Sequence, residues 1–317
     1  MNRQLCLLFL LVAAICSNLA AQNPDALLAA GKVDEVITLL EQKIRTAPNA
    51  EAYNQLCRAH FELGNWDAGI RDCEKAVALA PDIALDHLWL GRIYGEKADH
   101  SGFLTAAGLA KKVRTEFEHA VQLDPNNWEA RTDLAEFYLE APGIIGGGKD
   151  KATAQADLIA PLNLAMADWV RGRIAEKDHD NAAAERHFRA AIEASHSGAR
   201  AWLNLAGFYR HAQRFDDMEQ CLRTMESRPV DHPAALVDGA GLLLRTDRDL
   251  ALAIRLLRRY LSSTTTEEAP VFRAEFLLGQ LLEKQGDRQA AAEQYRTALT
   301  LAHNFHPAQE ALSRLGS

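Results

Sequence analysis

The feature that most constrains this chain is an eight-residue pattern that recurs along it. The copies are YNQLCRAH (53–60), HLWLGRIY (87–94), RTDLAEFY (131–138), WLNLAGFY (202–209) and EFLLGQLL (275–282). Each copy carries an aliphatic residue, then a small residue, then an aromatic or large residue at the same spacing. Leu56 and Leu90 are 34 residues apart, which gives the length of one unit. Because one such unit cannot bury its own apolar face, neighbouring units must stack.

A second apolar segment follows within the same unit. Examples are GIRDCEKAVALAP (69–81), VRTEFEHAVQLDP (113–125), AERHFRAAI (184–192) and AAEQYRTAL (291–299). Apolar residues spaced three and four apart predict an amphipathic helix in each half of the unit. Pro81 and Pro125 are expected to end two of the second helices, since proline disfavours helix in the residue before it. No segment alternates with period two, so we expect an all-α fold without a sheet.

These patterns resemble the tetratricopeptide repeat, a helix-turn-helix unit of about 34 residues. The resemblance runs from about residue 24 to the end, and it implies an all-α, right-handed α-solenoid. We expect this solenoid to fill residues 22–317 with about eight helical hairpins and a closing helix at 306–316. Two units are longer than the others, with insertions near 97–110 and 141–149.

The first 21 residues do not fit the repeat and are typical of a secretory signal peptide. Arg3 precedes an apolar run from Leu5 to Cys16, and small residues follow at Ala20 and Ala21. The run is shorter than the roughly 20 apolar residues that a membrane span needs. We therefore expect export to the periplasm or the extracellular space, without a membrane span. Loss of this segment removes one base and no acid, so the net charge of −8 becomes −9. An acidic chain of this kind is a poor partner for nucleic acid.

The run GIIGGGK (143–149) has the spacing of a phosphate-binding loop, but Asp150 stands where Ser or Thr should bind magnesium. A true phosphate loop follows a strand, whereas the segment before this run is predicted to be helical. A long turn between two helices is therefore the preferred interpretation, and a nucleotide-binding or enzymatic protein is the alternative. Such a turn can also bind a partner at the edge of a solenoid. The candidate residues for that role are Gly146, Gly147, Gly148 and Lys149.

No sequence pattern points to catalysis, a metal or a cofactor. HExxH, G-x-S-x-G and CxxC are all missing from the sequence. His303 and His306 are three residues apart, but no cysteine or carboxylate completes a ligand set. We therefore expect no catalytic residues, no metal site and no cofactor.

In the family that the chain resembles, the first helix of each hairpin lines a concave groove where peptides lie. Carried over, the resemblance places these residues in the groove: Arg58, Arg92, Arg173, Arg210, Arg245, Trp89 and Trp169. Arginine binds carboxylates through two parallel hydrogen bonds, so the expected partner is acidic or has a free carboxylate. The alternative is a solvated groove in which the arginines pair with Glu51, Glu96 and Glu136.

The expected function is a non-catalytic scaffold of the cell envelope that binds a protein or peptide. A structural subunit of an envelope complex is the alternative, and the sequence leaves the oligomeric state open. The resemblance also puts Cys57 and Cys73 in facing positions of one hairpin. In an oxidising compartment they could form a disulfide, whereas buried free thiols would serve equally well as small apolar side chains. Cys221 is expected to remain free.

Overall fold

The computed structural model describes residues 23–316, so the predicted signal peptide at 1–21 lies outside the described residues. Within this range the chain forms the α-helices α2 to α18 and one short 3-10 helix, η1 (Gly143–Ile145). The described residues contain no strand, and one isolated antiparallel bridge joins Thr266 to Ala269. The all-α class is confirmed.

The helices pair into eight consecutive hairpins. They are α2 (Pro24–Ala29) with α3 (Val33–Thr46), α4 (Ala50–Glu62) with α5 (Trp66–Leu79), α6 (Ala84–Asp99) with α7 (Phe103–Leu123), α8 (Trp128–Glu140) with α9 (Lys149–Ile159), α10 (Leu164–Lys177) with α11 (Asn181–Ala194), α12 (Ala199–His211) with α13 (Phe215–Glu226), α14 (Ala234–Thr246) with α15 (Leu250–Leu261), and α16 (Val271–Lys284) with α17 (Arg288–Leu301). The helix α18 (His306–Gly316) packs on α17 and closes the chain.

Short polar signals set the helix boundaries. The side chains of Asn49, Asn127 and Asn163 accept hydrogen bonds from main-chain amides in the first turns of α4, α8 and α10. Such caps satisfy amides that have no partner within the helix. The helices α5 and α7 each end two residues before a proline, at Pro81 and Pro125. The sequence therefore specifies where many of these helices start and stop.

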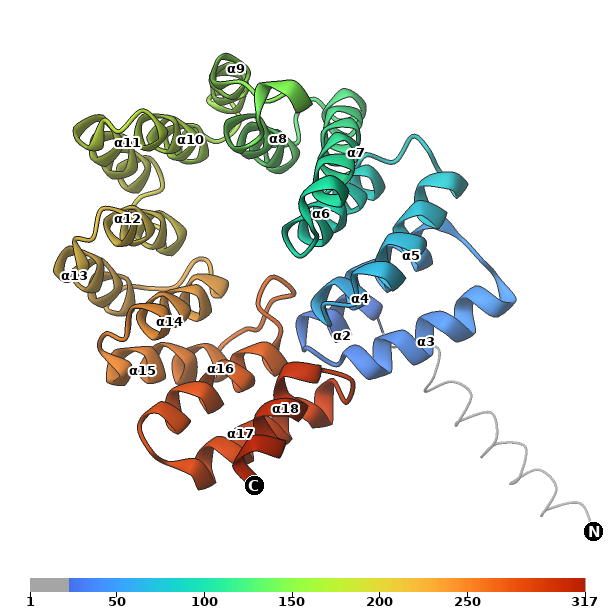
Figure 1. Ribbon diagram of the computed structural model, residues 1–317, viewed down its shortest axis with the longest axis vertical. Coiled ribbons are helices and arrows are strands. Elements are labelled where there is room, and N and C mark those ends of the chain that lie inside the picture. The colour runs from blue at the N-terminus through green and yellow to red at the C-terminus, as the bar shows by residue number, and fades with distance from the viewer. Residues whose placement is uncertain (1–22, 317) are drawn as a thin grey trace, which may run out of the picture.

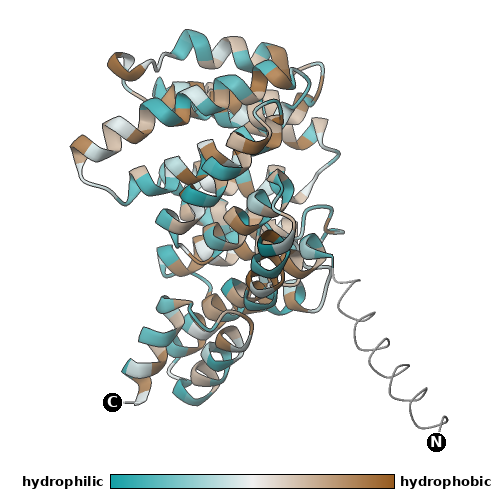
Figure 2. Cartoon of the chain, turned by 90° about the vertical axis from the view of Figure 1, so that its right-hand side faces the viewer, coloured by the Kyte–Doolittle hydropathy of each residue, from teal (hydrophilic) through white to brown (hydrophobic). Residues whose placement is uncertain are grey.

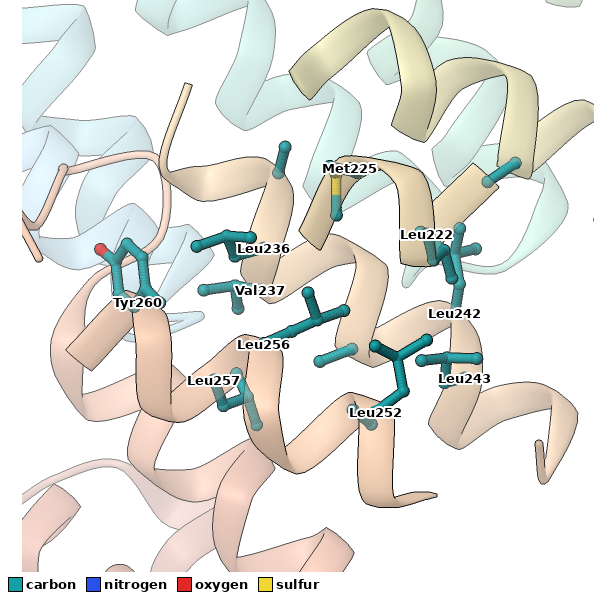
Figure 3. Close-up of a cluster of buried hydrophobic side chains, with 14 of the residues drawn as sticks. Leu222, Met225, Leu236, Val237, Leu242, Leu243, Leu252, Leu256, Leu257 and Tyr260 are labelled. Carbon is teal, nitrogen blue, oxygen red and sulfur yellow. The ribbon is translucent and has the colours of Figure 1, made fainter. Parts of the chain in front are cut away.

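The small-residue position of the first helix allows the two helices of a hairpin to touch. A Cβ atom at Gly91 would lie 2.4 Å from the ring of Phe117, and one at Gly279 would lie 2.4 Å from the ring of Tyr295. Successive hairpins then share one apolar core. Figure 3 shows Leu222 of α13, Leu236 of α14 and Leu256 of α15 meeting in such a cluster. Figure 2 shows that apolar and polar residues are interspersed along the helices, as in amphipathic helices.

The predicted insertion at 97–110 is largely helical. The helix α6 runs to Asp99, and α7 begins at Phe103 and is 21 residues long. The extra residues therefore lengthen the hairpin beyond its neighbours. Phe103 and Leu104 at its tip are each 85% exposed. The second insertion consists of η1 and a glycine turn between α8 and α9.

The solenoid bends so far that its first and last helices meet, as Figure 1 shows for α2–α4 and α16–α18. We call this contact the seam. Leu28, Val33 and Leu40 share a buried cluster with Phe272 and Phe305. Polar contacts cross the seam as well, because Arg273 bonds to carbonyl groups at the end of α4 and His303 pairs with Asp34. The eight hairpins and α18 therefore form a closed ring.

Candidate functional site

The arginine Arg58 in α4 is already bound to acidic residues of the chain itself. Its Nε donates to Glu267 over 2.7 Å, its Nη2 donates to the same carboxylate, and Nη1 lies 3.0 Å from Asp25. Burial lowers the pKa of Arg58, but hydrogen bonding and the charges of Glu267 and Asp25 outweigh it, so the pKa is raised overall. The carboxylate of Glu267 comes from the linker between α15 and α16. This arginine therefore belongs to the seam.

The arginines Arg92 and Arg173 are also neutralised from the neighbouring hairpin. Arg92 Nε donates to Asp133 over 2.6 Å. Arg173 donates to Glu136 over 2.8 Å and to Glu140 over 3.0 Å. Of the three acids that the alternative interpretation named for these arginines, only Glu136 is such a partner. Acids one hairpin away therefore cancel most of the positive charge expected here.

The two predicted tryptophans lie over these paired arginines. Trp89 has the guanidinium groups of Arg58 and Arg92 at 5.6 Å and 5.1 Å from its ring centroid. Arg173 is 5.5 Å from the ring centroid of Trp169. An arginine that stacks on an aromatic face keeps a fixed orientation. The tryptophans therefore help to hold the ion pairs in place.

Arg210 of α12 and Arg245 of α14 differ from the three paired arginines described above. Within the described residues neither forms an ion pair with a carboxylate, and Arg210 Nε is buried without a hydrogen bond. Burial, and then the positive charge of Arg210, lower the pKa of Arg245. Asp238 opposes that shift only through its longer-range charge. The two guanidinium groups therefore repel each other, and the charge of Asp238 offsets part of this repulsion without forming an ion pair.

A cavity of about 240 Å³ lies beside Arg245. Its walls include Trp169 of α10, His211 of α12 and Leu242 of α14, and the acids Glu176 and Asp238 also line it. Arg210 hydrogen-bonds to the ring of His211, which connects it to this cavity. The cavity therefore brings Arg245, Trp169 and the paired Arg173 together, with Arg210 joined to it through His211, whereas Arg58 and Arg92 line other cavities.

A larger cavity of about 780 Å³, which the sequence did not reveal, lies where several first helices begin. Its lining combines the apolar Trp128, Leu162 and Leu164 with the basic Arg200 and His232 and with acids that include Glu129 and Asp231. Glu268 contacts both basic residues, with a carboxylate oxygen 3.1 Å from Arg200 and another 3.0 Å from His232. The hydrogen bond from His232 is the main cause of a pKa of about 2 for Glu268. The acidic pair in TTTEEAP (264–270) was the available sequence signal for this site.

The glycine turn after α8 lacks the arrangement of a phosphate loop. The amides of Gly146, Gly147 and Gly148 donate to carbonyl groups of Gly143, Pro142 and Tyr138. Lys149 Nζ lies 3.0 Å from Asp178. No converging set of amides remains for a phosphate within this turn, every residue of which is described. Gly148 is the N-cap residue of α9.

The three cysteines of the described residues take two roles. Cys57 of α4 and Cys73 of α5 are joined as a disulfide, with their Cα atoms 5.3 Å apart. Cys221 is a buried free thiol, and burial raises its pKa to about 12. A thiol with such a pKa is almost never ionised near neutral pH and is therefore unreactive.

One group of side chains has the composition of a metal site. His87, Glu116 and His119 place their ligand atoms within 4.8 Å of one another. Both ring nitrogens of His87 already have partners, since Nδ1 lies 2.6 Å from Glu116 and Nε2 lies 2.8 Å from the carbonyl oxygen of Pro81. These contacts support a buried histidine–carboxylate pair that joins α6 to α7. Among the described residues, no helix is long and apolar enough to cross a bilayer.

Comparisons with known proteins agree with this geometry. The tetratricopeptide repeat family matches residues 50–83, and also residues 170–218 and 239–304. The solved structure of yeast Tom70 is similar over 90% of this chain and 58% of its own, with a TM-score of 0.54 and 16% identity. A tetratricopeptide repeat protein from Parabacteroides merdae is similar over 90% of this chain and 93% of its own, with a TM-score of 0.45 and 13% identity.

A curated relative, sperm-associated antigen 1 of Rattus norvegicus, is 28% identical over 110 residues. The match covers 35% of this chain and 11% of the relative, so it extends over a small part of that protein. Repeats of this kind form scaffolds for protein–protein interaction. The eight hairpins, their spacing and the family matches lead to one conclusion: the chain is an all-α solenoid of tetratricopeptide repeats.

Proposed function

We propose that this chain is an exported, non-catalytic scaffold that binds a carboxylate-bearing protein or peptide segment on its concave surface. The observation that carries the proposal is that Arg210 and Arg245 repel each other and that, among the described residues, neither forms an ion pair with a carboxylate. The other three groove arginines pair with acids of the chain itself. An incoming carboxylate therefore gains most at Arg210 and Arg245.

Binding at this pair has a clear physical basis. A carboxylate between two guanidinium groups accepts charge-assisted hydrogen bonds and removes their mutual repulsion. Trp169 and Leu242 provide an apolar wall beside Arg245, which suits an aliphatic side chain next to the acid. Arg245 is exposed, so a ligand can reach it without unfolding the hairpin.

Export and the lack of catalysis rest on other features. Solenoids of tetratricopeptide repeats generally act as scaffolds and not as enzymes. The signal-like sequence at 1–21 supports export, and a Cys57–Cys73 disulfide fits an oxidising compartment. The binding role therefore belongs to the periplasm or the extracellular space.

Crosslinking in the source cells, with and without changes at the arginine pair, tests the proposal. The double variant Arg210→Gln and Arg245→Gln should reduce capture of the partner at least about tenfold, since hydrogen bonds to charged groups contribute about 1.5–3 kcal/mol each. Arg186→Gln with Arg296→Gln is the matched control, because both residues are exposed on second helices. Equal capture by the two double variants would contradict the proposal. Loss of capture in a triple variant at Arg58, Arg92 and Arg173 instead would move the site to the neutralised half of the groove.

A further inference from the structure

The linker between α15 and α16 is unusual in length and in order. It contains nine residues, Ser262 to Pro270, whereas most connections between units have four or fewer. An antiparallel bridge joins Thr266 to Ala269 and makes a tight turn with Glu267 and Glu268 at its tip. The fully buried Tyr260 supports the turn, since its hydroxyl accepts from the Thr266 amide over 3.0 Å and donates to the Ala269 carbonyl. The fold therefore holds two adjacent carboxylates in fixed positions.

These carboxylates bind arginines in different parts of the ring. Glu267 pairs with Arg58 of α4, which is 209 residues away in the sequence. Glu268 pairs with Arg200 of α12 and with His232, which precedes α14. The four-residue turn 266–269 thus makes the contacts that an acidic peptide would make, at one site in α4 and at a second site formed by α12 and the segment before α14.

The surroundings of Glu268 have the chemistry of a peptide-binding site. The cavity of about 780 Å³ offers Arg200 and His232 to a carboxylate, and Leu162 and Leu164 to an apolar side chain. These leucines are 38% and 52% exposed, so their surface is available to a ligand. Cavities that bind ligands combine an apolar wall with a few polar groups in this way. In the structure, Glu268 is the acid that binds Arg200 and His232.

We propose that the turn 264–269 is an internal ligand, and that the partner is an extended acidic segment with adjacent carboxylates that displaces it. The inference rests on the proposed function and adds the kind of partner and a means of control. A site that its own chain occupies binds an outside ligand with an affinity reduced by the fraction of molecules in which the site is open. Release of Glu267 from Arg58 would also weaken the seam, so binding and ring opening are coupled.

A peptide with the sequence of the linker can serve as the probe for this test. A synthetic peptide SSTTTEEAP, blocked at both ends and labelled with a fluorophore, is titrated with the full chain and followed by fluorescence anisotropy. The variant Glu267→Gln with Glu268→Gln should bind this peptide at least about tenfold more tightly than the unchanged protein, because the competing ligand is gone. The same peptide with glutamine at both acidic positions should bind neither protein. Glu293→Gln, on the exposed face of α17, is the control and should behave like the unchanged protein.

Equal affinities of the double variant and the unchanged protein would overturn the inference, and so would an absence of binding to both. If circular dichroism shows that the double variant is unfolded, Glu268→Gln alone replaces it, since that change leaves the Glu267–Arg58 pair in place. Either negative result would leave capture through Arg210 and Arg245 intact, and the two hypotheses thus fail separately.

Discussion

The guanidinium group of Arg273 in α16 donates hydrogen bonds to the main-chain carbonyl of Glu62, the last residue of α4, from 211 residues away in the sequence. A further bond reaches the carbonyl of Phe61. The final carbonyl groups of a helix have no partner within it, and a cation at that end is favourable. Arg273 therefore acts as a cap that one end of the solenoid supplies to the other.

Arg273→Ala should weaken the seam. The change leaves the carbonyls of α4 and the buried Glu62 carboxyl without this donor, which should cost about 2 kcal/mol of stability. Thermal unfolding followed by circular dichroism measures the effect as a lower Tm. Arg296→Ala on the exposed face of α17 is the matched control and should leave the Tm nearly unchanged. An equal Tm for both variants would show that the contacts of Arg273 across the seam contribute nothing to stability.

The seam should also make stability depend on pH through Glu62. Burial raises the pKa of this carboxyl from 4.5 to about 8, against the attraction of Arg273. The folded chain therefore keeps a proton that the unfolded chain has lost between these two values. Stability is highest below pH 4.5 as far as this group is concerned, and it falls as the pH rises toward 8.

Glu62→Gln removes the group that titrates and should flatten this part of the profile. Denaturant midpoints at several pH values between 5 and 8.5, for both proteins, check the prediction. A slope that is the same with and without Glu62 would mean that this carboxyl is ionised in the folded state.

The glycine turn should be sensitive at one position and tolerant at another. A Cβ atom at Gly147 would lie 1.7 Å from the carbonyl oxygen of Ala141, whereas nothing lies within 4 Å of one at Gly143. Gly147→Ala should therefore lower stability by about 1–3 kcal/mol, the usual cost of overpacking. Gly143→Ala should change the stability little. Urea unfolding of both variants measures the difference. Comparable midpoints would mean that the turn rearranges freely.

The Cys57–Cys73 bond should survive isolation from an oxidising compartment. Non-reducing peptide mapping should yield one crosslinked peptide, and Cys221 should react with an alkylating reagent only after unfolding, because it is buried. Removal of a bond that encloses a loop of this size costs about 3 kcal/mol. The variant Cys57→Ala with Cys73→Ala should therefore melt lower, with Cys221→Ala as control. Three alkylatable thiols after unfolding would rule the bond out.

The sequence was informative about each hairpin and silent about contacts between distant hairpins. Periodicity and the 34-residue spacing gave the helix pairs, because each pair is specified by local residues such as Leu56 and Gly91. The groove arginines were found by their repeat positions, but their partners were not. Arg58 meets Glu267 only because the superhelix completes a turn, and no repeat position encodes that distance. For the same reason Arg200 and His232 escaped notice.

Closure has a consequence for how this protein can change over evolutionary time. An open solenoid can gain or lose a repeat internally, since each unit touches only its neighbours. Here α2–α4 must also meet α16–α18, so the angular steps of all units together have to complete one turn. Duplication or loss of a single hairpin would separate Arg273 from Glu62 and Glu267 from Arg58. Descendants of this chain are therefore expected to vary in side chains and loop lengths, while the number of hairpins stays constant.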